Sequence, residues 1–202
     1  LADQVNNYLV SFRHESPTNV GQADSLQGYC ADSYLLECEC PRFGSGEGKG
    51  VLKESVRGCD LFIMVDVTNY SLTYRVNGYE NHMSPDNHYQ DLKRIISAAD
   101  GKARRINGIM PFLYVGRQHK RSKRESLDCA LMLQELVDMG VSNILTFDAH
   151  DPRVSNSIPL HGFDSFMPTY QFLKALVNSV PDFVIDNDHL MIISPDEGAM
   201  GR

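Results

Sequence analysis

Three short strand-like runs, separated by segments with helical periodicity, constrain the fold more than any other feature of this sequence. The runs cover residues 60–65, 105–112 and 143–147, and each is rich in apolar side chains. The first is nearly continuously apolar, so we expect it to be buried on both faces. Residues 86–99 and 126–139 place apolar side chains along one helical face. Such alternation predicts an α/β fold, a mainly parallel sheet flanked by helices.

The pattern extends toward both ends of the chain. Residues 2–15 have apolar side chains at roughly helical spacing and predict a peripheral helix, and residues 34–40 are a strand candidate. A helix at 168–177 and a strand at 190–194 repeat the alternation. Residues 69–85, rich in Asn, Tyr and Gly, are expected to form a loop. Ser122 and Glu125 form a plausible capping pair for the helix that follows them.

Composition excludes several classes of protein. With 42% hydrophobic and 22% charged residues, the chain lies in the ordinary globular range. No apolar run reaches the ~18 residues that span a bilayer, and the first residues lack a signal-peptide layout. We therefore expect a cytoplasmic protein with no membrane partner.

The five cysteines form an odd set without a Cys-x-x-Cys pair. This pattern argues against a secreted disulfide framework and against a zinc ribbon. Cys38 and Cys40 would point the same way from a strand and could share a metal with a histidine. The simpler interpretation, which we adopt, is a set of reduced and mostly buried thiols.

The positive charge is concentrated in one segment of an acidic chain. The net charge is −7, yet residues 102–124 hold eight of the nineteen Lys and Arg and no acidic residue. A nucleic-acid surface usually makes the whole domain basic, so this island favours a local phosphate site over a DNA or RNA partner. On charge alone, a solvated basic loop explains the island equally well.

Polar clusters follow three of the expected strands. In open α/β sheets, ligands bind beyond the carboxyl ends of the strands, where loop amides and helix amino termini converge. Residues 113–121 supply cations and a histidine, 148–151 a histidine and carboxylates, and 195–198 further carboxylates. Together these groups suit a metal-bound polyphosphate.

Five segments in order resemble the sequence pattern of ribose-phosphate pyrophosphokinases. The Pro111-Phe112-Leu113-Tyr114-Val115-Gly116-Arg117-Gln118 segment is similar to the family's Pro-Tyr-x-x-Tyr-x-Arg-Gln-Asp. Each segment is a weak signal alone, whereas five in the right order are specific. The other four are Arg42-Phe43-Gly44-Ser45-Gly46-Glu47, residues 56–63, Phe147-Asp148-Ala149-His150 and the run from Ser194 to Arg202.

The resemblance implies a phosphoribosyltransferase-like three-layer fold. It also implies transfer of the β,γ-diphosphoryl group of ATP to the C1 hydroxyl of ribose 5-phosphate, with Mg²⁺, giving phosphoribosyl pyrophosphate and AMP. Phosphoryl transfer of this kind rests on positioning and charge neutralisation, so no residue is assigned a covalent catalytic role.

The resemblance also assigns site residues. Arg117 and Gln118 would contact ATP, and Lys120 and Arg121 would add positive field. The residues that match the family's metal-linked positions are His150 and Asp196. The Asp196 carboxylate is a natural magnesium ligand, and His150 could instead hold the metal's water or a phosphate. A loop from Arg42 to Glu47 would close over the ATP of a neighbouring subunit, which makes a homo-oligomer part of the active site. In this loop, the residues that would contact ATP are Phe43, Ser45 and Glu47.

Several features depart from the family pattern. Ser45 and His119 each stand where the family has an acidic residue, and the stretch at 69–85 is longer than the family's.

We expect residues 1–30 to be an N-terminal helical extension and 31–202 to be the ATP- and metal-binding domain of a two-domain synthetase. The C-terminal ribose-phosphate-binding domain would be absent, so the chain alone would be inactive. The alternative is a regulatory or interaction homologue that has lost catalysis.

Overall fold

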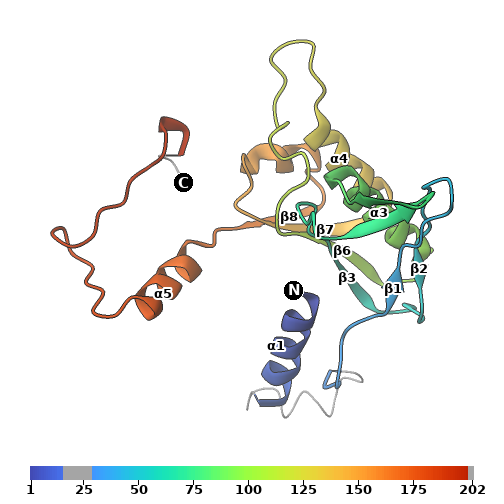
Figure 1. Ribbon diagram of the computed structural model, residues 1–202, viewed down its shortest axis with the longest axis horizontal. Helices are drawn as coiled ribbons and strands as arrows, with labels where there is room; N and C mark the ends of the chain where they lie inside the picture. Colours follow the sequence, from blue (N-terminus) through green and yellow to red (C-terminus); the bar gives the residue numbers. More distant parts are fainter. Residues whose placement is uncertain (16–28, 200–202) are drawn as a thin grey trace. The chain divides into compact units, whose positions relative to one another are not determined.

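The computed structural model describes residues 1–15 and 29–199, and these fall into two units (Figure 1). The first unit runs from Leu1 to Phe166 and the second from Met167 to the end of the chain.

A four-stranded parallel sheet is the centre of the first unit (Figure 1). Its strand order is β3-β6-β7-β8, and Phe62, Asn107 and Asn143 stand side by side on its three neighbouring strands. The predicted α/β class with a mainly parallel sheet is therefore confirmed. The fourth strand was not expected from the sequence. The strands are β3 (Asp60–Met64), β6 (Arg105–Met110), β7 (Val141–Phe147) and β8 (Gly162–Phe166).

Two helices, α3 (Pro85–Ala98) and α4 (Asp128–Asp138), lie together against one face of this sheet. Their apolar faces and the sheet form one core, in which Leu92, Leu133 and Ile144 are at most 2% exposed. The α3 helix begins where Ser84 Oγ accepts a hydrogen bond from the Asn87 backbone amide at 3.2 Å. The expected helices therefore form because their apolar periodicity faces the sheet.

The α4 helix has no such side-chain cap. The hydroxyl of Ser122 donates to the Glu125 carboxylate at 3.3 Å, but the helix begins only at Asp128. The expected capping pair is thus a local loop contact, because the chain stays non-helical for two more residues after Glu125.

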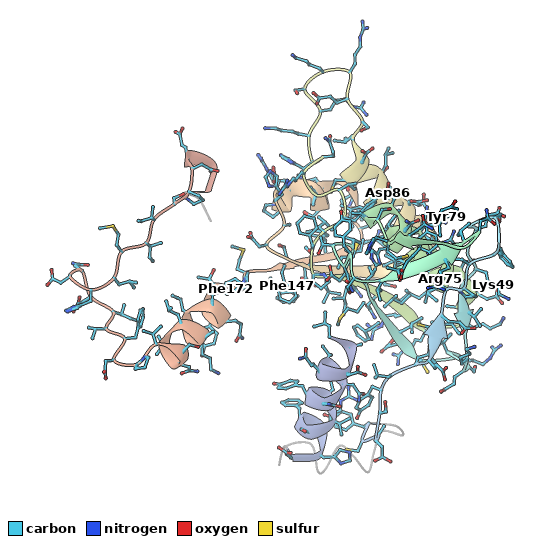
Figure 2. All side chains as sticks on the ribbon, viewed as in Figure 1. Lys49, Arg75, Tyr79, Asp86, Phe147 and Phe172 are labelled. Atoms are coloured by element: carbon cyan, nitrogen blue, oxygen red, sulfur yellow. The ribbon has the colours of Figure 1, made fainter. Side chains whose placement is uncertain are left out.

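The opposite face of the sheet exposes three phenylalanines. Phe62, Phe147 and Phe166 are 60%, 48% and 49% exposed, and Figure 2 labels Phe147. The expectation that residues 60–65 are buried on both faces is wrong. The reason is that α3 and α4 pack on the other face of the sheet, so Phe62 projects from the same exposed face as Phe147 and Phe166.

The segment at 69–85 contains a β-hairpin instead of an unstructured loop. Strand β4 (Thr73–Val76) pairs antiparallel with β5 (Tyr79–His82). Asn77 and Gly78 join them with φ angles of 51° and 83°, which suits the two-residue turn that matches strand twist. Asn-Gly between two short strands was a signal that the compositional description as a loop overlooked.

Near the amino terminus, helix α1 (Ala2–Glu15) forms as predicted. The Asn6 side chain accepts a hydrogen bond from the Tyr34 backbone amide at 2.8 Å, which links the helix to the chain that follows. The expected strand at 34–40 shortens to β1 (Cys38–Glu39), paired antiparallel with β2 (Val51–Leu52).

The second unit contains helix α5 (Thr169–Ser179) and a short 3-10 helix at Glu197–Ala199. The predicted helix at 168–177 is confirmed. The predicted strand at 190–194 is wrong, because these residues pair with no other strand in the described part of the unit. Arg202, which ends the fifth family-like segment, lies outside the described residues. No helix in the described ranges is long and apolar enough to span a membrane.

The cysteines are free, but they are less buried than expected. Only Cys129 is fully buried, whereas Cys38 and Cys59 are exposed. Burial raises the pKa of the Cys129 thiol to about 11, and burial together with the Asp91 carboxylate raises that of Cys40 to about 11.

These pKa values predict selective alkylation. With a pKa of about 11, roughly one thiol in a thousand is ionised at pH 8, and only the thiolate reacts. We expect iodoacetamide to modify Cys59 at least about ten times faster than Cys40 or Cys129 in the folded chain, as followed by peptide mass spectrometry. In urea, where burial is lost, the three cysteines should react at similar rates. Similar rates for the three cysteines in the native protein as well would contradict the prediction.

Candidate functional site at the carboxyl edge of the sheet

The loop after β6 carries the predicted nucleotide residues. Arg117 and Gln118 are both exposed. The Gln118 backbone amide donates to the Val115 carbonyl at 2.9 Å, and the Gln118 carbonyl accepts from the Cys129 amide at 3.3 Å. The loop backbone is therefore fixed between the end of β6 and the start of α4, while both side chains face solvent.

The backbone is strained at this edge of the sheet. Val115 and Asp148 have φ angles of 50° and 43°, in the left-handed region that non-glycine residues, and β-branched ones above all, rarely occupy. Val115 follows β6, and Asp148 follows β7 directly. Such strain persists only where surrounding contacts impose it, and it concentrates at functional sites.

The loop after β7 is held by the neighbouring strand. The Asp148 amide donates to the Phe166 carbonyl at 2.9 Å, and the Ala149 amide donates to Ser165 Oγ at 2.9 Å. These bonds to β8 and its end fix the backbone immediately before His150, whose side chain is exposed at the carboxyl edge.

The two loops meet through their histidines. The ring centroids of His119 and His150 are 5.0 Å apart, with the planes tilted by 56°. His119 Nε2 also lies 3.7 Å from Asp151 Oδ2, and both side chains are mostly buried, at 12% and 13% exposure. The structure therefore brings the segment Arg117-Gln118-His119 to the segment His150-Asp151, as parallel strands end at a common edge.

The Asp151 carboxylate is also tied locally. Arg153 binds both of its oxygens, with Nη2 at 2.6 Å from Oδ2 and Nε at 2.9 Å from Oδ1. These bonds to Arg153, helped by the charge of His119, hold the pKa of Asp151 well below its usual range. The carboxylate therefore stays ionised beside His119.

Sequence reasoning placed His119 and Asp151 in the polar clusters that follow the strands, but it assigned neither residue a role of its own. The convergence of the loops after β6 and β7 at one edge of the sheet was the signal that could have given both residues a role.

The remaining predicted residues belong to two other segments of the chain. Phe43, Ser45 and Glu47 are exposed on a loop closed by a hydrogen bond from the Phe43 amide to the Glu47 carbonyl at 2.7 Å. Asp196 belongs to the second unit, where its carbonyl accepts a hydrogen bond from Ser194 Oγ at 2.6 Å. Because Leu190–Ser194 is not a strand, Asp196 does not follow a strand end as expected.

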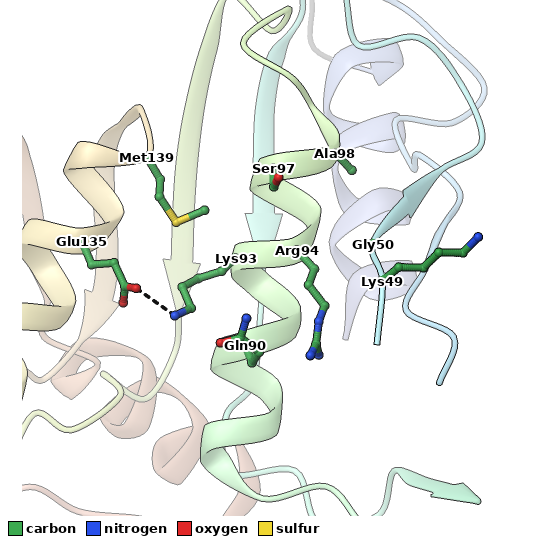
Figure 3. A pocket seen from close by; sticks show the side chains of 9 residues that line it. All are labelled: Lys49, Gly50, Gln90, Lys93, Arg94, Ser97, Ala98, Glu135 and Met139. Atoms are coloured by element: carbon green, nitrogen blue, oxygen red, sulfur yellow. Dashed lines mark hydrogen bonds and ion pairs between the residues drawn. The ribbon is translucent and has the colours of Figure 1, made fainter. Parts of the chain in front are cut away.

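Two open depressions lie in the first unit beside α3 and α4. One, of about 540 Å³, is lined mostly by residues of α3, together with Lys49, Gly50, Glu135 and Met139 (Figure 3). In it Lys93 Nζ is 2.8 Å from Glu135 Oε1, an ion pair that joins α3 to α4. The other, of about 430 Å³, adjoins the stacked rings of Tyr89 and Tyr114, whose centroids are 4.5 Å apart. None of the predicted nucleotide or metal residues lines either depression.

Comparison with known proteins identifies the family. Residues 1–140 match the model for the N-terminal domain of ribose phosphate pyrophosphokinase. The chain belongs to this family.

The ribose-phosphate pyrophosphokinases of Staphylococcus epidermidis and Clostridium perfringens are 27% and 28% identical to this chain over 172 and 173 residues. Each alignment covers 83% of the chain, and 47% and 48% of the respective relatives. The chain thus spans about half the length of the curated relatives it matches.

A solved structure shares the fold. The phosphoribosylpyrophosphate synthetase from Mycobacterium smegmatis superposes with a TM-score of 0.59 at 22% identity. The match covers 73% of this chain and 45% of that chain. At this identity the likeness supports the α/β fold alone.

Proposed function

We propose that this chain is the ATP- and metal-binding part of a ribose-phosphate diphosphokinase. In the whole protein, the C1 hydroxyl oxygen of ribose 5-phosphate would attack the β-phosphorus of ATP. The bond between the α,β-bridging oxygen and that phosphorus would break, AMP would leave, and the hydroxyl proton would be released. The meeting of the Arg117–His119 segment with His150 at the carboxyl edge of the sheet is the observation that carries this proposal.

The chain's own residues would bind and orient the nucleotide. Arg117 offers delocalised charge and several donors in a plane, which suits both phosphates and the adenine ring. Gln118 adds amide donors and an acceptor, and Lys120 and Arg121 raise the local positive potential. Hydrogen bonds already hold the backbone of this loop, so these side chains can bind the triphosphate with little further loss of backbone entropy.

The donor set fits a magnesium ion that is held mainly by phosphates and water. Within the described ranges, no group of three or more His, Cys, Asp or Glu side chains could hold a metal by itself. Mg²⁺ usually takes only one or two protein ligands beside phosphate oxygens and waters. We propose that the protein's own ligands to Mg²⁺ are His150 and Asp196. When bound, Mg²⁺ would neutralise charge on the transferred diphosphoryl group.

The loop of Phe43, Ser45 and Glu47 would contact the ATP of a neighbouring subunit in a homo-oligomer. We further propose a cytoplasmic enzyme of nucleotide biosynthesis that acts on small phosphorylated substrates, without a nucleic-acid or membrane partner. The chain by itself would bind ATP without turning over.

The first test is calorimetric titration of this chain with ATP and Mg²⁺. Arg117→Ala is expected to weaken ATP binding by about ten-fold or more, because a charge-assisted contact is lost. His150→Ala is expected to weaken binding in the presence of Mg²⁺.

The matched control is Arg104→Ala, an exposed arginine just before the amino end of β6, which should leave the affinity unchanged. Equal losses at Arg104 and Arg117 would indicate non-specific attraction by the basic segment. Beside His150, this chain has His119 where the family has an acidic residue, and this change could have removed ATP binding. A full-length protein that neither binds ATP nor turns over would therefore favour the non-catalytic homologue.

A further inference from the structure

The β4–β5 hairpin lies against the predicted ATP loop, residues 43–47. We call these residues the 43–47 loop. The hairpin occupies the segment in which this sequence departs from the family pattern. In Figure 2, Arg75 and Tyr79 are labelled on it, and Tyr79 is 76% exposed. On β4, Tyr74 and Val76 face away from Arg75 and are partly buried.

Arg42 is the anchor at the base of the 43–47 loop. Its guanidinium lies 5.1 Å from the centroid of the Tyr74 ring, within the range of a cation–π contact. It also donates to Asp91 Oδ2 at 2.8 Å and to the Cys40 carbonyl at 2.9 Å. With only 6% of its side chain exposed, Arg42 is fixed from three sides, and the hairpin supplies one of them.

The hairpin also reaches the turn of the loop. Gly46 has φ of 92°, which only glycine adopts readily, and its amide donates to the Phe43 carbonyl at 2.9 Å. A Cβ built on Gly46 would lie 3.7 Å from Val76 Cγ2, in ordinary contact. Tyr74 and Val76, two residues apart on one face of β4, therefore meet the loop at its base and at its turn.

The loop closes on the other side of the anchor. Arg42 and Gly48 form an isolated antiparallel bridge, and a Cβ on Gly48 would come within 2.6 Å of Arg42 Nη1. The two ends of the loop are thus joined at the residue that the hairpin holds. A five-residue segment ordered by so few internal bonds depends on such outside contacts for its conformation.

We propose that the β4–β5 hairpin is a positioning element for the 43–47 loop, and that Tyr74 is its principal positioning residue. The ring of Tyr74 fixes the guanidinium of Arg42, and Arg42 fixes both ends of the loop. The role of the positioned loop, contact with the triphosphate of a nucleotide, rests on the proposed function above. The positioning itself does not.

Hydrogen–deuterium exchange on the 202-residue chain without nucleotide tests the positioning. Tyr74→Leu keeps apolar bulk and removes the ring. We expect the amides of Phe43 and Gly46 to exchange roughly five to ten times faster in this variant, because a cation–π contact holding the loop is lost. Tyr74→Phe keeps the ring and should restore the wild-type exchange rate.

Tyr79→Leu, which changes a 76% exposed tyrosine of the same hairpin, is the matched control and should leave the loop's exchange unchanged. Exchange in α4 reports global stability and should be the same in all four proteins. Unchanged exchange of the loop in Tyr74→Leu, or an equal increase in Tyr79→Leu, overturns the proposal.

Calorimetric titration of the same four proteins with ATP and Mg²⁺ tests the nucleotide role. We expect at least a three-fold loss of affinity in Tyr74→Leu alone. Faster loop exchange together with wild-type affinity would overturn the nucleotide role of the hairpin. Absence of ATP binding in the wild-type chain would instead count against the proposed function, and the exchange data would still decide the positioning.

Discussion

Replacing Asp91 by alanine is expected to lower the free energy of unfolding by about 3 kcal/mol, because it leaves a buried guanidinium without its counter-ion. The side chains of Arg42 and Asp91 are 6% and 17% exposed, and the ion pair between them is 2.8 Å long. Asp91 also binds Arg94 Nη1 at 2.6 Å, so one substitution removes two contacts. Urea unfolding followed by circular dichroism measures the change.

The matched control for this prediction is an exposed ion pair. Asp60 and Arg105 are bonded at 2.9 Å, but their side chains are 32% and 54% exposed. Asp60→Ala should therefore destabilise the protein much less than Asp91→Ala, since solvent screens such pairs. A loss at Asp91 as small as that at Asp60 would mean that solvent or other groups satisfy Arg42 in the folded chain.

Replacing Leu136 by alanine is expected to destabilise the first unit by about 2–5 kcal/mol, through lost burial and the cavity left behind. Leu136 is 0% exposed and lies on the face of α4 that packs into the core. Urea unfolding at equilibrium again gives the change in free energy of unfolding.

Leu131 on the same helix provides the control. It is 59% exposed, so Leu131→Ala should change the stability by no more than about 0.5 kcal/mol. Because both substitutions remove the same atoms from the same helix, helix propensity cancels between them. Similar effects at the two positions would show that the core does not lie where the structure places it.

Much of the fold followed from local patterns. The spacing of Tyr89, Leu92 and Ile96 determined that residues 85–98 form a helix with one buried face. Strand-length apolar runs located β3, β6 and β7 to within two residues, because the strands of a helix-covered parallel sheet need apolar side chains toward the core.

The failures have physical reasons. Residues 162–166 form strand β8 although Gly162, Asp164 and Ser165 give them no apolar pattern, because pairing with β7 imposes the conformation. Residues 190–194 have strong strand propensity, yet they pair with no strand in the described part of the second unit. Strand propensity expresses itself only where a neighbouring strand offers its hydrogen bonds.

The sequence by itself determined the family, the α/β class and the residue types that could hold a nucleotide, because these depend on order and periodicity along the chain. Tertiary structure decided that His119 lies against His150 and Asp151, since the parallel sheet brings two loops about thirty residues apart to one edge. It also decided that a hairpin supports Arg42 at the base of the 43–47 loop. Contacts of this kind depend on strand order and on which side chains share a face, and no local pattern encodes either.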